Sequence, residues 1–378
     1  ELFGYEVSIF ENTAVVSAPL GTTDGNGQNW LGDAGEVCIF ERQQGGTWIL
    51  HQKIVPSDRE AIDEFGRAIA IHEDLIIVGA PQEDHDENGQ NAFDGAGSAY
   101  IFERNGNGQW TEVAKLVASD READDEFGNA VSIDRGVAVV GCRRKKSLVR
   151  GSLEDRVGAA YVFESNGLGS WAEVAKIQAL DKGPRNDFGG ALDVEGDRIA
   201  VGATGNSYNS SGADSLTIAG AAYVFQKLSG TWSQIQKIVP PDRVLADGFG
   251  RAISISGTSC IIGSPAEDGD WNGMGQEPTY GAAYIFERDY GVNISQAFES
   301  SPITAYPNPT SANISLDLGA SYNQAIISVH DLAGREVGDY QFSHTSQANL
   351  PLSEYPAGVY FISCDLDGER HTVKVVRE

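Results

Sequence analysis

Hydrophobic and polar positions in the first 290 residues repeat with a period of about 62 residues. Each unit opens with Phe-Gly, and its phenylalanines are Phe3, Phe65, Phe127, Phe188 and Phe249. Two short, nearly continuous apolar runs follow, for example residues 68–71 and 75–78. Such runs are typical of strands covered on both faces, so the pattern predicts a central β-hairpin in every unit.

Two further strands are predicted in each unit. A tripeptide of mostly small residues ends the hairpin at Ser17-Ala18-Pro19, Gly79-Ala80-Pro81, Gly141-Cys142-Arg143, Gly202-Ala203-Thr204 and Gly263-Ser264-Pro265. An aromatic strand then comes at residues 37–40, 99–102, 160–163, 222–225 and 283–286, and a tryptophan opens a fourth strand at Trp48, Trp110, Trp171 and Trp232. The fourth strand carries a recurring lysine, namely Lys53, Lys115, Lys176 and Lys237, which favours an outer strand whose edge is protected by charge.

A four-stranded unit cannot bury its faces alone, and radial stacking of such units gives a propeller. The sequence therefore predicts an all-β protein with a β-propeller of at least five four-stranded blades, numbered here 1 to 5 by their Phe-Gly. These repeats resemble the FG-GAP family of integrin α-subunit propellers. Integrin-like repeats carry a calcium loop inside the first hairpin, but here that turn is short, as at residues 72–74, so those ligands do not carry over.

The chain changes character after the fifth aromatic strand. Alternating apolar positions, broken by turn formers, predict a small Ig-like β-sandwich, and they are Ile314, Leu316, Leu318, Ala325, Ile327, Val329, Val359 and Phe361. Four landmarks, at residues 306–309, 331–335, 356–360 and 374–376, resemble the C-terminal sorting domain of type IX secretion. The expected division is a propeller over 1–290, a linker over 291–302 and a sorting domain over 303–378.

Composition excludes several classes of function. The chain has 54 acidic and 27 basic residues and a net charge of −27, which argues against a nucleic-acid partner. No apolar run is long enough to span a membrane. The sorting domain implies handling by the type IX secretion machinery and a secreted or surface-anchored product. Since Glu1 aligns with the middle of a repeat, we expect a Trp-led strand to precede it in the full-length protein.

The loops between strands 2 and 3 carry a candidate calcium signal. Alternate oxygen ligands before a glycine turn suit a hard cation. Blades 2 and 5 match this D-x-D-x-N-G pattern and blade 1 has a weaker version, so the predicted Ca²⁺ ligands are Asp84, Asp86, Asn88, Asp94, Asp268, Asp270, Asn272, Asp24 and Asn26. Solvated acidic turns are the alternative.

The links between blades carry a second set of acidic and amide residues at recurring positions. Their recurrence favours a structural role for Asp58, Asp120, Asp181, Asp242, Asp63, Asp125, Asn186 and Asp247.

Blade 3 has a basic loop in the same place. Its residues Arg143, Arg144, Lys145 and Lys146 form a candidate site for an anionic partner. Alternatively, they pair with the acidic loop of the neighbouring blade 2.

The pattern gives little support for catalysis. Six scattered histidines form no metalloprotease motif, and no nucleophile elbow or phosphate loop is present, so no catalytic residue is assigned. We expect a binding or adhesion module that recognises an extracellular protein or polysaccharide through the long loops of the propeller, with possible help from Ca²⁺. Two alternatives stay open: a calcium-dependent carbohydrate-active enzyme and a passive surface-layer scaffold.

Overall fold

The structure is a computed structural model that describes residues 2–167, 169–208, 216–240, 245–266, 281–287, 303–308, 310, 312–331, 336–367 and 369–377. It divides the chain into two compact units, Glu1–Phe286 and Glu287–Glu378. The described residues form strands and turns, and they contain no helix that is long and apolar enough to cross a membrane.

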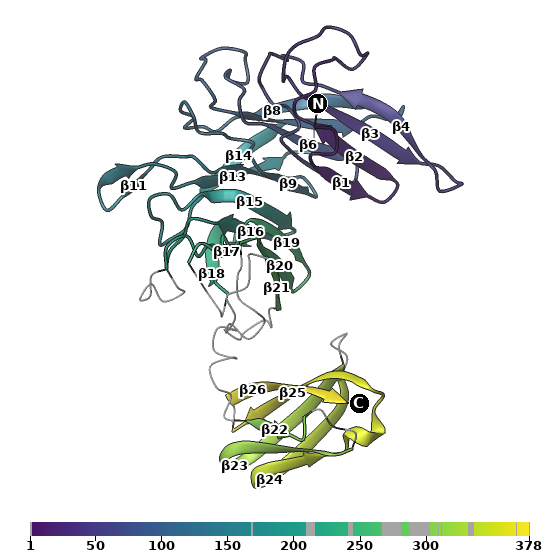
Figure 1. The fold of residues 1–378 in the computed structure, drawn as a ribbon, viewed down its shortest axis with the longest axis vertical. Coiled ribbons are helices and arrows are strands. Elements are labelled where there is room, and N and C mark those ends of the chain that lie inside the picture. Colours follow the sequence, from purple (N-terminus) through teal and green to yellow (C-terminus); the bar gives the residue numbers. More distant parts are fainter. Residues whose placement is uncertain are drawn as a thin grey trace. The chain divides into compact units, whose positions relative to one another are not determined.

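The first unit consists of antiparallel sheets that follow one another along the chain (Figure 1). Blades 1 and 2 contain β1 (Val7–Phe10), β2 (Thr13–Ala18), β3 (Glu36–Arg42) and β4 (Trp48–Ile54), then β5 (Ala68–His72), β6 (Leu75–Ala80), β7 (Ser98–Arg104) and β8 (Trp110–Leu116). Blade 3 contains β9 (Val131–Asp134), β10 (Val137–Cys142), β13 (Ala159–Ser165) and β14 (Trp171–Ile177). Blade 4 contains β15 (Phe188–Glu195), β16 (Arg198–Ala203), β17 (Ala221–Leu228) and β18 (Thr231–Ile238), and the described part of blade 5 contains β19 (Ala252–Ser256), β20 (Ser259–Ser264) and β21 (Ala282–Glu287).

The order of strands within each sheet confirms the predicted blade. Strands 1 to 4 pair in sequence order, so the Trp-led strand lies at the outer edge of blades 1 to 4. The first strands β1, β5, β9, β15 and β19 contact one another in succession and line the inside of the stack. Sequence periodicity missed one element, the hairpin of β11 (Ser147–Val149) and β12 (Ser152–Glu154), which projects from blade 3 (Figure 1).

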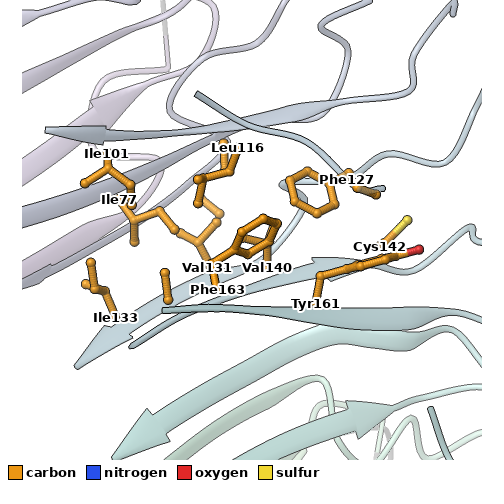
Figure 2. Packing of buried hydrophobic residues seen from close by; sticks show 14 of the residues in the cluster. Ile77, Ile101, Leu116, Phe127, Val131, Ile133, Val140, Cys142, Tyr161 and Phe163 are labelled. Atoms are coloured by element: carbon orange, nitrogen blue, oxygen red, sulfur yellow. The ribbon is translucent and has the colours of Figure 1, made fainter. Parts of the chain in front are cut away.

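The Phe-Gly phenylalanine closes the core between two blades. Figure 2 shows Phe127 beside the side chains of blade 2, such as Leu116, and those of blade 3, such as Tyr161. Its ring is fully buried and meets the rings of Tyr161 and Phe163 edge-on, at centroid distances of 5.5 and 6.1 Å. Phe65, Phe188 and Phe249 are buried in the same way, whereas Phe3 is exposed, so four of the five phenylalanines join consecutive blades.

The glycines of the repeat allow this joint to close. Gly128 has a φ of 94°, which favours glycine, and its carbonyl oxygen lies against Gly79 of the preceding blade. A Cβ at Gly79 would approach that oxygen to 1.9 Å. The small residue before Ala-Pro is thus required by the next blade, and not by its own turn.

The second unit has its own core and its own sheet. Its strands are β22 (Thr304–Tyr306), β23 (Ile314–Asp331), β24 (Glu336–Leu350), β25 (Gly358–Leu366) and β26 (Glu369–Arg377), with a short 3-10 turn, η2 (Leu352–Glu354). The long β23 pairs with β22, β24 and β25, and its register with β24 shifts between Asp317 and Tyr322. All six apolar positions predicted on β23 are buried. On β25 the buried set is Tyr360, Ile362, Cys364 and Leu366, so the alternation predicted from Val359 and Phe361 has the opposite phase.

Candidate binding face

One end of the stacked blades carries the long connections that the structure describes in the first unit. It is formed by the 2–3 loops (residues 19–35, 81–97, 143–158, 204–208 and 216–220) and by the links between blades (residues 55–64, 117–126, 178–187, 239–240 and 245–248). We call this end the long-loop face. Each link hydrogen-bonds to the 2–3 loop of the blade before it, as Ile62 N–H does to the Gly32 oxygen at 2.9 Å and Asp124 N–H to the Asp94 oxygen at 2.8 Å. These bonds join loops and links into one continuous surface.

The 2–3 loops of blades 1 and 2 have the same internal structure. Asp86 Oδ1 accepts the N–H groups of Asn88 (2.9 Å) and Gln90 (2.8 Å), and its Oδ2 accepts the Asn91 amide at 2.6 Å. Asp24 accepts the equivalent three bonds in blade 1. Accepting these bonds lowers the pKa of both carboxyls, with the N–H four residues further on as the largest cause. Each loop is therefore closed by its own donors.

These bonds bear on the predicted calcium ligands. Both oxygens of Asp24 and of Asp86 face N–H donors, and Asp84 Oδ1 accepts the Gly95 N–H at 2.8 Å. Within the described part of the chain, no three His, Cys, Asp or Glu side chains gather into a group that could hold a metal ion. In both loops the Asp24 and Asp86 carboxylates are therefore engaged in hydrogen bonds within the loop. The predicted ligands of blade 5, Asp268, Asp270 and Asn272, lie outside the described residues.

An arginine from the following link braces each of these loops. Arg121 donates to the backbone oxygens of Asn91 (2.7 Å) and Asp84 (2.5 Å), and its guanidinium lies 5.3 Å from the centre of the Phe93 ring. In blade 1, Arg59 donates to the Asn29 oxygen at 2.9 Å. Loops held in this way keep one shape before any partner arrives, which lowers the entropic cost of binding.

The recurring lysines of the outer strands do not protect an edge, and here the sequence prediction was wrong. Lys115 Nζ lies 2.6 Å from Asp58 Oδ2 and 2.8 Å from Glu83 Oε2, and the Lys115 side chain is only 7% exposed. The Tyr100 hydroxyl donates to the other oxygen of Asp58 at 2.9 Å. Because lysine and tyrosine are cross-strand partners, the aliphatic part of the lysine runs beside the ring and its ammonium reaches the link.

The same Tyr-Asp-Lys arrangement recurs in blades 3 and 4. Tyr161 and Lys176 share Asp120, and Tyr223 and Lys237 share Asp181. The structural role predicted for Asp58, Asp120 and Asp181 is confirmed, since each ties a link to the blade that follows it. Asp242, the equivalent residue of the next link, lies outside the described residues.

The basic loop of blade 3 is tied into the same layer. Lys145 is 3% exposed and its ammonium lies 2.8 Å from Asp125 Oδ2, while Arg143 Nε and Arg144 Nε lie 2.9 and 3.2 Å from the oxygens of Glu126. These acids belong to the link into blade 3. They are not the blade 2 loop residues considered from the sequence. Lys146, the fourth residue of the candidate anion site, is exposed.

Large apolar side chains are exposed across the long-loop face. The loops contribute Trp30, Phe93, Leu148, Leu153, Tyr208 and Ile218, and the links contribute Ile62, Leu180 and Leu245. Trp30 is 74% exposed. Leu148 and Leu153 are cross-strand partners on the projecting hairpin. Exposed apolar side chains also lie elsewhere in the first unit, for example Leu50 and Val174, so these nine residues are candidate contacts only together with the fixed loops that carry them.

A pocket of about 420 Å³ lies where the five first strands begin, at the inner end of the long-loop face. Its lining includes Glu6, Glu64, Arg67, Arg143 and Arg251. Sequence reasoning missed this site, because its residues lie about 60 positions apart. The available signal was the residue that follows each Phe-Gly.

The profile of the FG-GAP repeat family matches residues 48–102, 110–163, 171–225 and 232–286, which together make up more than half of the chain. The chain belongs to the FG-GAP repeat proteins. Each match runs from a Trp-led strand to the next aromatic strand, so it spans the joint between two blades. The secretion system C-terminal sorting domain matches residues 304–378, in the second unit. This domain indicates type IX secretion and attachment to the cell surface or outer membrane. A comparison with curated proteins finds no match.

Proposed function

We propose that this FG-GAP protein is a binding or adhesion module of the cell surface that recognises an extracellular polysaccharide or protein through its long-loop face. The observation that carries the proposal is the combination of braced loops and exposed apolar side chains at that end of the blades. Arg59 and Arg121 hold the loops in place, and Trp30 projects from one of them. Rigid aromatic side chains on a preorganised surface are typical of binding sites.

The sorting domain supports the same proposal, because it delivers the long-loop face to a compartment in which extracellular partners are present. Calcium assistance remains a prediction. A contribution from the described loops of blades 1 and 2 would require Asp24 and Asp86 to exchange their internal hydrogen bonds for metal bonds.

Binding of the full chain to glycan and protein arrays, with and without millimolar Ca²⁺, tests the proposal. Trp30→Ala should abolish the signal. Trp48→Ala is the matched control, since Trp48 is 37% exposed and lies at the opposite end of blade 1. An equal loss in both variants would contradict recognition through the long-loop face. Absence of any bound partner, with normal surface display, would favour a passive scaffold.

A second candidate, a carbohydrate-active enzyme, is favoured by one observation. Glu64 and Glu126 line the same pocket, yet their surroundings differ. Burial raises the pKa of Glu64, with further contributions from Glu126 and Asp33, whereas Glu126 is ion-paired with Arg143 and Arg144. A carboxyl with a raised pKa and an ion-paired carboxylate in one pocket are the kind of pair that serves as general acid and base in glycoside hydrolysis. Release of reducing ends from polysaccharides, lost in Glu64→Gln, would support this function.

A further inference from the structure

The pocket at the inner end of the long-loop face is built by all five blades, and we call it the axial pocket. The residues that directly follow each Phe-Gly meet there, namely Tyr5, Arg67, Asn129, Gly190 and Arg251. Its volume of about 420 Å³ is in the range of sites for small ligands. One repeat position therefore supplies chemically different side chains to a single site.

Three arginines converge in the axial pocket of a chain that has twice as many acidic as basic residues. Burial lowers the pKa of Arg67, and the nearby charges of Arg143 and Arg251 lower it further. Arg67 Nε lies 4.0 Å from Glu64, at the limit of an ion pair, and among the described residues the Arg251 side chain has no hydrogen-bond or ion-pair partner. Two of the three guanidinium groups thus have donors to offer to a carboxylate.

Carboxylates line the same pocket, and they limit which anions it suits. Glu126 is paired with Arg143 and Arg144, and Glu6 Oε2 accepts the Ile69 N–H at 2.7 Å. Among the residues that the structure describes, the Glu64 carboxylate has only the distant Arg67 as a partner. A ligand with anionic groups alone would leave Glu6 and Glu64 facing like charges. A ligand that combines one carboxylate with several hydroxyl donors satisfies both kinds of group.

Tyr5 adds an aromatic surface to the axial pocket. Its side chain is 43% exposed, and the Arg67 guanidinium lies 4.7 Å from the centre of its ring. A flat ring next to a guanidinium provides both an apolar face and a carboxylate-binding fork. Sugar rings with a carboxyl group have the complementary surfaces, namely apolar C–H faces, hydroxyls and one anionic group.

We propose that the axial pocket binds an acidic glycosyl unit, that is, a uronic acid residue of an extracellular polysaccharide. The inference deepens the proposed function and rests on it. Arg67 and Arg251 receive the carboxylate, Glu6 and Glu64 accept bonds from the hydroxyls, and Tyr5 packs against the sugar ring. An acidic peptide is a poorer occupant, because a carboxylate side chain brings no hydroxyl donors for the two glutamates.

Calorimetric titration of the full chain with digalacturonate tests the inference, and its methyl diester is the matched ligand that lacks the charges. We expect the diester to bind at least tenfold more weakly than digalacturonate. We also expect Arg251→Gln to weaken digalacturonate binding about tenfold or more, as for a lost charge-assisted hydrogen bond. Arg251 is exposed and has no hydrogen-bond or ion-pair partner within the described chain, so its replacement should leave the melting temperature unchanged.

Arg150→Gln is the control variant, because Arg150 is an exposed arginine in the β11–β12 turn, outside the axial pocket. Equal weakening by Arg150→Gln and Arg251→Gln would mean general electrostatic attraction and would overturn the inference. Tetraglutamate binding as tight as that of digalacturonate would overturn the assignment to a sugar. A chain that binds an array partner in a Trp30-dependent way but ignores digalacturonate would overturn the axial pocket alone and leave the proposed function standing.

Discussion

Replacement of Phe127 by alanine should show that the Phe-Gly phenylalanines hold the blades together. Phe127 is fully buried between blades 2 and 3 and contacts Tyr161 and Phe163 (Figure 2). Removal of a buried phenylalanine ring costs about 3–5 kcal/mol, because transfer free energy is lost and a cavity remains. We expect the upper part of this range, since two aromatic contacts are lost as well.

Phe3 provides a control within the same motif. It occupies the same repeat position in blade 1, but it is 58% exposed and its aromatic neighbour, Phe40, lies at a centroid distance of 6.4 Å. Phe3→Ala should therefore cost less than about 1 kcal/mol. The two variants make the same chemical change, so their difference isolates burial between blades.

Urea unfolding followed by tryptophan fluorescence measures both free energies. All six tryptophans precede residue 287, so the signal reports the first unit and not the sorting domain. The unfolding midpoint of Phe127→Ala should lie at a lower urea concentration, and the slope of the unfolding free energy against urea concentration should be unchanged. If Phe127→Ala lowers the free energy of unfolding by less than about 1 kcal/mol, or if both variants lower it equally, the phenylalanines do not hold the blades together.

Three further predictions follow from the links and the sorting domain. Lys115→Met should destabilise the first unit by about 3–5 kcal/mol in urea titrations, because it leaves Asp58 and the buried Glu83 without their shared cation. Burial raises the pKa of Asp63 from 3.8 to about 7, so the folded state binds a proton that the unfolded state releases between these values. The contribution of Asp63 to stability should therefore rise as pH falls from 7 to 4, by on the order of 4 kcal/mol at most. Asp63→Asn should reduce this dependence in thermal melts, and the rest belongs to other buried carboxyls such as Glu6 and Asp125, whose pKa burial also raises. Deletion of residues 287–378 should leave the tryptophan-detected unfolding midpoint unchanged but should retain the protein inside the producing cell, as fractionation would show.

Much of the fold could be predicted because its determinants are local and repeated. The five Phe-Gly pairs, the apolar hairpins and the aromatic strands predict the order of the strands within each blade, although not the additional hairpin of β11 and β12. The sequence did not show why a small residue opens the tripeptide at the end of each hairpin. In blade 2 this residue is Gly79, and it is small because the backbone of Gly128 in the next blade lies against it. The sequence shows that a small residue recurs at this position, but the neighbouring backbone that requires it is visible only in the packed blades.

Two errors have a common physical origin. Lys115 was placed at a solvent-facing edge because a charged residue on an outer strand is usually exposed, yet its long side chain reaches a buried carboxylate beyond the end of the strand. On β25 the set that begins with Val359 and Phe361 continues with the polar residues Ser363 and Asp365, and the wholly apolar set of Ile362, Cys364 and Leu366 forms the core instead. Patterns of hydrophobicity give the element but do not always give the direction of a side chain.

The candidate site was less predictable than the fold. The long-loop face was expected from topology, and the basic residue Lys145 was singled out, but its pairing with Asp125 depends on how the link folds back. The axial pocket was not foreseen, because Arg67 and Arg251 are brought together only by the radial arrangement of the blades. A pocket formed by successive blades can be predicted only by comparing the residues that occupy the same repeat position in each blade.

Hydrogen exchange of the full chain, free and saturated with a partner from the arrays, tests the central claim most directly. Recognition through the long-loop face predicts slower exchange in residues 19–35, 81–97 and 143–158, with no change in the turns at the opposite end, residues 43–47 and 105–109. Protection of those opposite turns, with unchanged exchange in the long loops, would contradict the account.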